Sequence, residues 1–409
     1  MHGYIFTIEI KENEMAVKRR KRKNRARKKI LLLVFELLLL AVILGSLWVF
    51  SKTLGAATQT DSIDDGEAGI NKDIDEKSLA AQEGYTNIAL FGIDNRETGQ
   101  YGSGNADTIM IASIDNSTKE VRLVSIYRDT YLDVDGAGNY HKANSAYSVG
   151  GALGTIQMLN NNLDLTLTQY VSVDWAALVD AIDALGGLDL EITDGEVAGI
   201  NKYLHDVDKA TGKSTPLVTQ SGLVHLDGSQ ATTYARLRKG LGDDYKRTSR
   251  QRIVLQEMLN KAKESDIATL TSICEAVFKH VETNIPLTQM LQMITDVSKY
   301  EIVETTGFPS VQSTMMISKE DCVVPATLSS NVEELHQFLF AGEDYTVSQT
   351  VQTLSDNISY LTGVTENSSL VDTSGGSDTA GKNGTDVQTE SETSSQTSSQ
   401  TSSQTNLTN

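Results

Sequence analysis

Cysteine is scarce in this chain, which contains only Cys274 and Cys322 among its 409 residues. Neither residue belongs to a CxxC pair or to a cluster of Cys and His, so the sequence gives little support for a zinc site. A disulfide between the two is permitted outside the cytoplasm. Their positions along the chain give no geometry to judge, and two buried free thiols are an equally good interpretation.

Two common kinds of catalytic loop are also missing. The glycines at 102 and 104, and those between 150 and 154, do not complete a GxGxxG or a Walker pattern. No GxSxG motif occurs, and the six histidines lack the partner spacing of a catalytic triad. The sequence therefore argues against a nucleotide-binding protein and against a serine hydrolase.

Acidic residues predominate in the chain except near its N-terminus. The formal net charge is −19, yet the run from Lys18 to Lys29 holds ten Lys or Arg and no acid. The next segment, Ile30–Phe50, is apolar except for Glu36, Gly45 and Ser46. A helix of this length spans a hydrocarbon core of about 30 Å. Because positive residues stay on the cytoplasmic side, we expect a single-pass cell-membrane protein with a cytoplasmic N-terminus and an extracellular globular domain.

Composition divides the chain into five segments. We predict a cytoplasmic basic tail (1–29), a transmembrane helix (30–50), a solvated extracytoplasmic linker (51–83), a globular domain (84–362) and a disordered tail rich in Ser, Thr and Gln (363–409). A cleaved signal peptide is the alternative for the second segment, but its apolar stretch is longer than a usual signal. Translation from Met15 is a further alternative, since that residue directly precedes the basic run.

Strand-like and helix-like stretches alternate within the predicted globular domain. Short β-branched runs predict strands at 87–92, 108–114, 121–126, 170–173 and 188–192. Apolar residues at helical spacing predict helices at 144–163, 175–185, 229–236, 246–263, 267–281 and 287–300. This order indicates an α/β protein, with an α/β/α sandwich as its architecture.

Two acidic residues stand at the ends of neighbouring predicted strands. Asp94 follows the first strand and Asp107 precedes the second. If the strands are antiparallel neighbours, both carboxylates emerge at the same sheet edge, where they would suit Mg²⁺. The alternative, that acids merely terminate strands, is about equally good from the sequence alone.

Basic residues form a local island near the middle of the chain. The window 236–252 holds seven Lys or Arg against two Asp. Arg236 and Arg238 are two residues apart, whereas Arg247 and Gln251 share one helix face. Arg128 follows the third predicted strand. Guanidinium groups donate bidentately to phosphate, so acids and arginines together indicate phosphoryl chemistry. An exposed, ion-paired helix face is the alternative.

Eight motifs in order give the sequence a specific resemblance to the LytR-CpsA-Psr family of bacterial cell-wall proteins, over about 85–345. The motifs are GIDNR (92–96), ADTIM (106–110), VSIYRDT (124–130), HKANSAYSVGG (141–151), VSVDW (171–175), DALGGLDL (183–190), HLDGSQATTYARLRK (225–239) and DDYKRTSRQ (243–251). The resemblance implies a membrane-tethered α/β/α domain with a central mixed sheet. It also implies a Mg²⁺-dependent phosphotransferase that moves a teichoic acid or capsule polymer from a polyprenyl pyrophosphate donor to peptidoglycan.

The resemblance also implies roles for individual residues. Asp94 and Asp107 would face the metal, and Asp244 would orient Arg247 or act as the base for the acceptor hydroxyl. The residues that would hold the pyrophosphate are Arg128, Arg236, Arg238, Arg247 and Gln251. Further substrate-binding candidates are Arg96, Lys142, Asn144 and Arg250.

The sequence departs from the family pattern at two places. Asn105 and Ala106 stand where the family commonly has Arg-Ser, and Tyr127 replaces a proline before Arg128. The helices around 146–163 and 175–185 resemble the walls of the family's lipid pocket, although their spacing alone is that of an ordinary core.

Two other functions use the same features. A polyprenyl pyrophosphate phosphatase would need the same residues with water as the acceptor. A non-catalytic regulator would bind nucleic acid through the basic run or sense lipid through the outer domain. Membrane topology and anionic headgroups explain the basic run more simply, so we expect a membrane partner and no nucleic acid.

Overall fold

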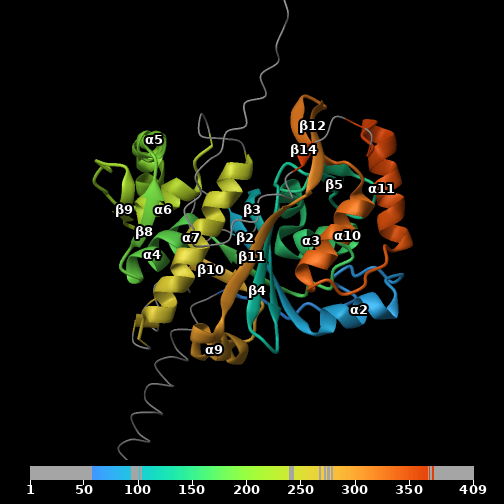
Figure 1. Cartoon of the computed structure of the whole chain (residues 1–409), viewed down its shortest axis with the longest axis horizontal. Coiled ribbons are helices and arrows are strands. Elements are labelled where there is room, and N and C mark those ends of the chain that lie inside the picture. Colours follow the sequence, from blue (N-terminus) through green and yellow to red (C-terminus); the bar gives the residue numbers. More distant parts are fainter. Residues whose placement is uncertain are drawn as a thin grey trace, which may run out of the picture.

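A seven-stranded mixed sheet forms the centre of the computed structural model (Figure 1). The structure describes residues 58–93, 101, 104–238, 244–266, 269–270, 273, 277, 280–366, 368 and 371–372. Across the sheet the strands are β1 (Thr58–Gln59), β10 (Val281–Thr283), β7 (Gln169–Val173), β2 (Tyr85–Ile93), β3 (Ala106–Asp115), β4 (Glu120–Ile126) and β11 (Glu301–Phe308). Helices cover both faces, so the predicted α/β class and sandwich architecture are confirmed.

Strands β2, β3 and β4 form an antiparallel meander at the middle of the sheet. Residues 109–114 of β3 are buried without interruption because both faces of the strand are covered. β7 and β11 run parallel to β2 and β4 respectively. The strands that flank Asp94 and Asp107 are therefore antiparallel neighbours, with a register shift after Gly92, which is the condition for both acids to emerge at one sheet edge.

One face of the sheet carries four helices and the main hydrophobic core. Tyr147 of α3 packs edge-on against Phe91 of β2, with ring centroids 5.6 Å apart. The covering helices are α2 (Glu76–Glu83), α3 (Ser145–Leu163), α10 (Leu328–Leu339) and α11 (Gln349–Thr362). The strands beyond them are β5 (Tyr131–Asp133), paired with β6 (Tyr140–Lys142), and β12 (Val311–Ile317), paired with β13 (Glu320–Pro325).

The opposite face is covered by α7 (Asp244–Glu264) and α9 (Leu287–Thr295), which a short 3₁₀ turn (Val297–Lys299) follows. Beside α7 lies a second hydrophobic core. This core is built from α4 (Trp175–Ala184), β8 (Leu188–Ile192), α5 (Asp194–Thr211), β9 (Gly222–Leu226) and α6 (Gly228–Ala235). The strand predicted at 188–192 is present, but it pairs with β9 in a separate sheet.

The predicted solvated linker is wrong for residues 58–83. β1 pairs with β10, Ala68 is fully buried, and Asp75 caps α2. Gln82 lies buried and donates its amide to Asp164 O at 3.0 Å. In this segment polar side chains hydrogen-bond to buried backbone groups. Such packing does not require apolar residues at regular spacing, so the sequence shows little apolar periodicity.

Three further predictions concern segments that lie partly or wholly outside the described residues. β14 (Val371–Asp372) pairs with β12, which corrects the disordered tail at these two residues, and 373–409 lie outside the described part. The helix predicted at 267–281 falls mostly outside it, and Val281 begins a strand. Within the described residues no helix is both long and apolar enough to cross a bilayer, and the predicted helix at 30–50 lies outside them.

Glycine at position 228 allows α6 to approach α4 closely. A Cβ there would lie 2.2 Å from Val179 O and 2.8 Å from the Asp183 carboxylate. We expect Gly228→Ala to lower the free energy of unfolding by about 1–3 kcal/mol because backbone must move to relieve the clash. Urea denaturation followed by tryptophan fluorescence would measure this change.

Gly84→Ala is the matched control. A Cβ at residue 84 would meet no atom within 4 Å, and the backbone φ of −70° suits alanine. Equal unfolding curves for the two variants would contradict the close packing of α6 on α4.

Candidate active site

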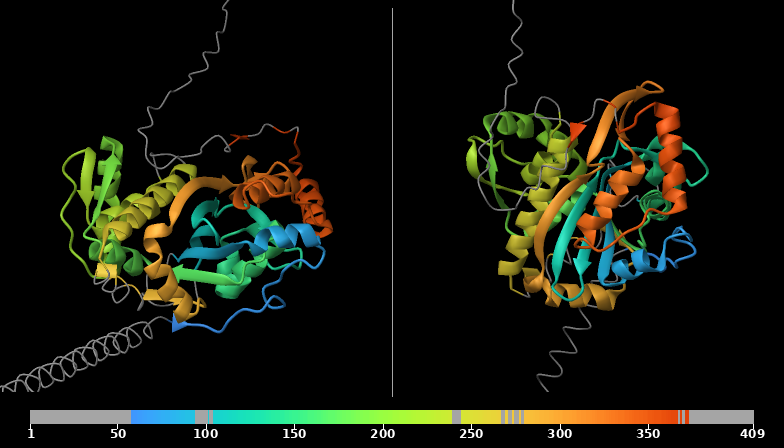
Figure 2. Two further views of the ribbon diagram at one scale, coloured as in Figure 1. Left: turned by 60° about the horizontal axis from the view of Figure 1, so that its bottom comes forward. Right: turned by 45° about the vertical axis from the view of Figure 1, so that its right-hand side comes forward.

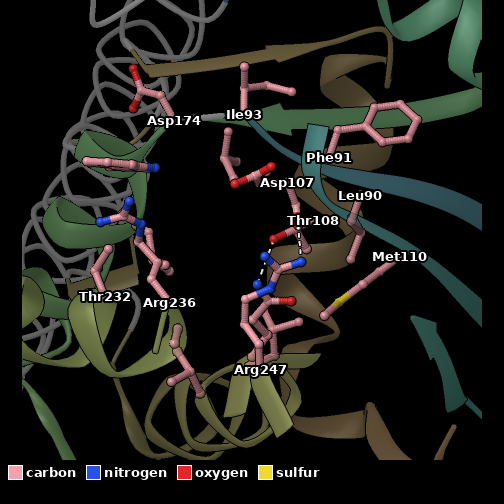
Figure 3. Close-up of a pocket in the computed structure, with 18 of the residues that line it drawn as sticks. Leu90, Phe91, Ile93, Asp107, Thr108, Met110, Asp174, Thr232, Arg236 and Arg247 are labelled. Carbon is pink, nitrogen blue, oxygen red and sulfur yellow. Dashed lines mark hydrogen bonds between the residues drawn. The ribbon is translucent and has the colours of Figure 1, made fainter. Parts of the chain in front are cut away.

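A cavity of about 440 Å³ lies between the sheet and the helices α4, α6 and α7 (Figure 3). Its floor is formed by β2, β3 and β7, and its polar lining residues are Asp107, Thr108, Arg128, Asp174, Thr232, Arg236, Arg238, Arg247 and Gln251. The remaining lining residues are Leu90, Phe91, Gly92, Ile93, Met110, Val171, Val173, Trp175, Leu178, Ala235, Val254 and Leu255. Charged groups and a long apolar surface thus share one cavity.

The polarity of the cavity changes along the strand direction. Strand register places Leu90, Met110 and Val171 in one row across the floor. The next row contains Val173, Gly92 and Thr108, and beyond it Asp107 stands near the end of β3. Along β3 the floor therefore runs from an apolar side chain to polar ones.

Helix α7 repeats this order on the facing wall. Leu255, Gln251 and Arg247 are four residues apart and so lie on one helix face. Gln251 donates its amide to Thr108 Oγ1 at 2.9 Å, and Arg247 donates to Asp107 O at 3.1 Å (Figure 3). Because floor and wall agree, one end of the cavity is apolar and the other is lined by polar and charged groups.

Glycine at position 92 makes room for this contact. A Cβ there would lie 2.8 Å from Thr108 Cβ. The glycine thus leaves the Thr108 hydroxyl in place beneath Gln251.

Arg128 enters the charged end from beyond β4. Its Nη1 lies 2.6 Å from Asp107 Oδ1, and its Nε lies 3.6 Å from Asp129 Oδ2. The Arg128 side chain is only 16% exposed. Two carboxylates therefore hold this guanidinium at the cavity wall.

Arg236 and Arg238 follow α6 and both line the cavity. The Arg236 guanidinium carbon lies 3.4 Å from the centre of the Trp175 ring, which fixes the plane of the group. Arg238 is more open, with 41% of its side chain exposed and its Nη2 4.0 Å from Asp129 Oδ2.

Three predicted substrate-binding residues do not line the cavity. Arg250 is buried beside α5, where its Nε donates to Glu196 Oε1 at 2.7 Å. Lys142 Nζ lies 3.1 Å from Asp129 Oδ1, so it pairs with an acid. Asn144 is buried at the start of α3 and donates its backbone N–H to Arg128 O.

Other predictions fall outside the described residues or need revision. Asp94 and Arg96 lie outside the described part, and so does the side chain of Asp244, the first residue of α7. Of the two helices expected to form the lipid pocket, α4 lines the cavity, whereas α3 covers the other face of the sheet. Cys322 is buried and free, and Cys274 lies outside the described residues.

Sequence reasoning missed Trp175, Asp174 and Thr108 as cavity residues. The first two belong to the VSVDW motif, where Asp174 caps α4 by accepting from Ala177 N at 2.8 Å. The sequence alone gives no sign that these two residues are functional. The sign comes from the structure, in which Arg236 stacks on the Trp175 ring.

The charges decide which ligand chemistry suits the cavity. Four arginines and two aspartates line it, so the polar end carries a net positive charge inside an acidic chain. Among the described residues no group of three or more His, Cys, Asp or Glu could hold a metal ion by itself. The cavity is therefore suited to an amphiphile with an anionic head and a long apolar tail.

Known proteins are similar to this chain in sequence and in fold. The profile of the LytR_cpsA_psr family matches residues 49–337. The Bacillus subtilis polyisoprenyl-teichoic acid--peptidoglycan teichoic acid transferase TagV is 28% identical over 324 residues, covering 78% of this chain and 79% of that protein. The corresponding enzyme TagU of Enterococcus faecalis is 29% identical over 246 residues, covering 57% of this chain and 76% of that protein.

Solved structures of similar proteins have the same fold as this chain. B. subtilis TagV superposes with a TM-score of 0.50 at 27% identity, covering 64% of this chain and 98% of that one. TagT bound to LIIa-WTA superposes with a TM-score of 0.52 at 20% identity, covering 63% and 91%. TagT with bound octaprenyl pyrophosphate lipid has a TM-score of 0.50 at 19% identity, covering 69% and 97%, and these two TagT structures show the shared fold.

The different surroundings of Arg250 and Arg238 lead to opposite expectations. We expect Arg250→Ala to cost about 3 kcal/mol of unfolding free energy because Glu196 would lose its buried partner. Arg238→Ala should cost less than about 1 kcal/mol, since this side chain is well exposed, but should weaken binding of inorganic pyrophosphate. Urea denaturation and titration calorimetry would measure the two effects. Normal stability with lost pyrophosphate binding in Arg250→Ala would contradict the placement of Arg250.

Proposed function

The chain belongs to the LytR-CpsA-Psr family, and on that premise we propose that it transfers a glycopolymer of the teichoic acid or capsule type from a polyprenyl pyrophosphate carrier to peptidoglycan. The observation that carries this proposal is the single cavity with an arginine-lined end and an apolar end. The names of the TagV and TagU relatives, which are teichoic acid transferases, and the polyprenyl lipid bound to the TagT fold neighbour support it.

In this proposal the donor lies along the polarity of the cavity. The isoprenoid chain packs over Leu90, Met110 and Leu255, and the pyrophosphate lies at the opposite end, among the four cavity arginines. Guanidinium groups retain their charge and match the oxygens of a phosphate, so they hold the head in one orientation. Arg236 is restrained by the Trp175 ring, which reduces the entropy lost when it binds.

The reaction is a displacement at the phosphorus nearest the glycan. The acceptor sugar hydroxyl forms a new O–P bond there, and the bond from this phosphorus to the bridging oxygen breaks. Polyprenyl phosphate leaves with the bridging oxygen, and the hydroxyl proton passes to a base, for which we propose Asp244. Arginines at the charged end stabilise the negative charge that builds on the leaving phosphate.

We further propose that Asp94 and Asp107 hold Mg²⁺. Asp107 places a carboxylate on the cavity wall beside the arginines, which fits an ion that takes one or two protein carboxylates and otherwise binds phosphate oxygens and water. When bound, the ion would neutralise phosphate charge.

The location is likewise a proposal, which the charge and hydropathy of the N-terminal segments support. We propose a catalytic domain that lies outside the cell and is anchored in the membrane, which the basic run 18–29 and the apolar run 30–50 support. Donor lipid and peptidoglycan would both be within reach there.

The central test uses the full chain in proteoliposomes with a polyprenyl pyrophosphate-linked glycan, Mg²⁺ and peptidoglycan oligomers. We expect glycan joined to the oligomer through a phosphodiester, detected by mass spectrometry. Arg236→Ala and Asp107→Asn should each lower the rate of transfer by at least about 100-fold, because the first removes a cation beside the reacting phosphates and the second removes a ligand of the proposed Mg²⁺.

Lys299→Ala is the control, since this lysine is exposed on the 3₁₀ turn and pairs with Asp296. It should transfer at the rate of the parent chain. Release of glycan only as a free sugar phosphate would indicate a phosphatase instead, and full activity in Arg236→Ala would refute the site.

A further inference from the structure

A buried tyrosine stands between the end of β4 and Arg128, and the proposed reaction gives it no role. Tyr127 is only 4% exposed. Its backbone N–H donates to Phe308 O at 2.9 Å, a bond that proline could not make at this position. Its carbonyl accepts from the backbone N–H of Thr130 at 2.9 Å. The backbone of Tyr127 is therefore fixed both to β11 and to the turn that follows β4.

The ring of Tyr127 lies against the start of α7. It meets the ring of Tyr245 edge-on, with centroids 4.7 Å apart and the two planes at 90°. Tyr245 is the second residue of α7, and its hydroxyl accepts from the buried side chain of Gln312 in β12. Edge-on aromatic rings attract each other because the positive edge of one faces the negative face of the other. The contact thus ties the first turn of α7 to the end of β4.

Glycine at position 307 of β11 leaves room for the Tyr127 ring. A Cβ there would lie 2.1 Å from Tyr127 Oη and 2.4 Å from its Cζ. Gly307 pairs with Ser125 in the parallel ladder of β11 and β4. The ring therefore rests directly on the backbone of a sheet strand, and Figure 2 shows α7 alongside this strand.

The residues that follow the two tyrosines meet at Asp107. Arg128 comes directly after Tyr127, and its Nη1 lies 2.6 Å from Asp107 Oδ1. Arg247 comes two residues after Tyr245 and donates to Asp107 O at 3.1 Å. Both arginines line the charged end of the cavity. A shift of the first turn of α7 relative to β4 would therefore change the spacing of the two guanidinium groups.

We infer that Tyr127 is a positioning residue, which holds the first turn of α7 against the end of β4 and so sets the spacing of Arg128 and Arg247 around Asp107. This inference rests on the proposed function, which assigns these arginines to the pyrophosphate. Arg252 binds β4 and β11 more than one turn further along α7, so it restrains the middle of the helix. Tyr127 restrains the end that carries Arg247.

Calorimetric titration of the full chain with inorganic pyrophosphate tests the inference. Tyr127→Leu keeps the backbone N–H but removes the ring, and should weaken binding at least about fivefold. Tyr127→Phe keeps the ring and should bind within about twofold of the parent chain. Gly307→Ala should weaken binding because its methyl group would displace the ring, but should cause no further loss when combined with Tyr127→Leu. Equal binding by the parent chain and Tyr127→Leu would overturn the inference.

Two further measurements distinguish positioning from a general loosening of the fold. When Arg247 is already replaced by alanine, Tyr127→Leu should weaken binding less than about twofold, because the group it positions is gone. Tyr85→Leu is the matched control, since Tyr85 packs edge-on against Phe340 with centroids 5.2 Å apart, at the end of β2 remote from the cavity. It should lower the urea midpoint and leave pyrophosphate binding unchanged. Equal losses from Tyr127→Leu with and without Arg247 would overturn the inference.

Glycan transfer by the same variants separates this inference from the proposed function. If the parent chain transfers glycan and the losses in pyrophosphate binding are additive, only the inference fails. If the parent chain binds pyrophosphate but transfers no glycan, the proposed function fails, and non-additive losses still support the role of Tyr127. A parent chain that binds no pyrophosphate would refute the site and, with it, the inference.

Discussion

The attachment of α7 to the sheet is the constraint on which the cavity depends. Polar bonds from Arg247 and Gln251 to β3 join the helix to the sheet at its N-terminal half, whereas Leu255 joins it through apolar contact one turn further on. Directly after Gln251 the buried Arg252 donates to Ser125 Oγ and Thr306 O, which fixes α7 over β4 and β11. A buried guanidinium is costly unless it is hydrogen-bonded, so these partners restrict the helix to one position. The order of residues along α7 then determines which end of the cavity is charged.

The arginine-lined end shows why guanidinium groups, rather than ammonium groups, suit this position. A lysine at position 236 could not stack as a plane on Trp175, and its flexible stem would leave the charge unrestrained. The stack in turn needs α4 and α6 to be close, and Gly228 permits this because it has no Cβ, which at this position would lie 2.2 Å from Val179 O. Gly228, in a helix of the second hydrophobic core, thus contributes to the position of the Arg236 guanidinium in the cavity.

Much of the fold could be predicted because its central strands and α7 are encoded locally, in apolar runs and helical periodicity. Asp107, Arg128, Arg236, Arg238, Arg247 and Gln251 could likewise be placed from strand ends and spacing. Sequence reasoning failed where a residue's environment is set by a partner far away in the sequence. Arg247 and Arg250 are three residues apart and chemically identical, yet one lines the cavity and the other pairs with Glu196, 54 residues away. The packing of residues 58–83 depends in the same way on backbone acceptors such as Asp164 O, which no local pattern reveals.

The distribution of charge gives these features a common physical logic. In a chain with a net charge of −19, an anionic ligand is disfavoured over most of the surface and favoured where several arginines converge in a recess with apolar walls. Low-dielectric walls strengthen the interaction between the arginines and a phosphate, since less water screens it. The same walls hold an isoprenoid chain without regard to the charge of its head. A carrier lipid could therefore stay bound by its tail while its pyrophosphate is converted to a monophosphate. The monophosphate carries less negative charge, so its contacts with the arginines would be weaker. This weakening would favour release of the lipid.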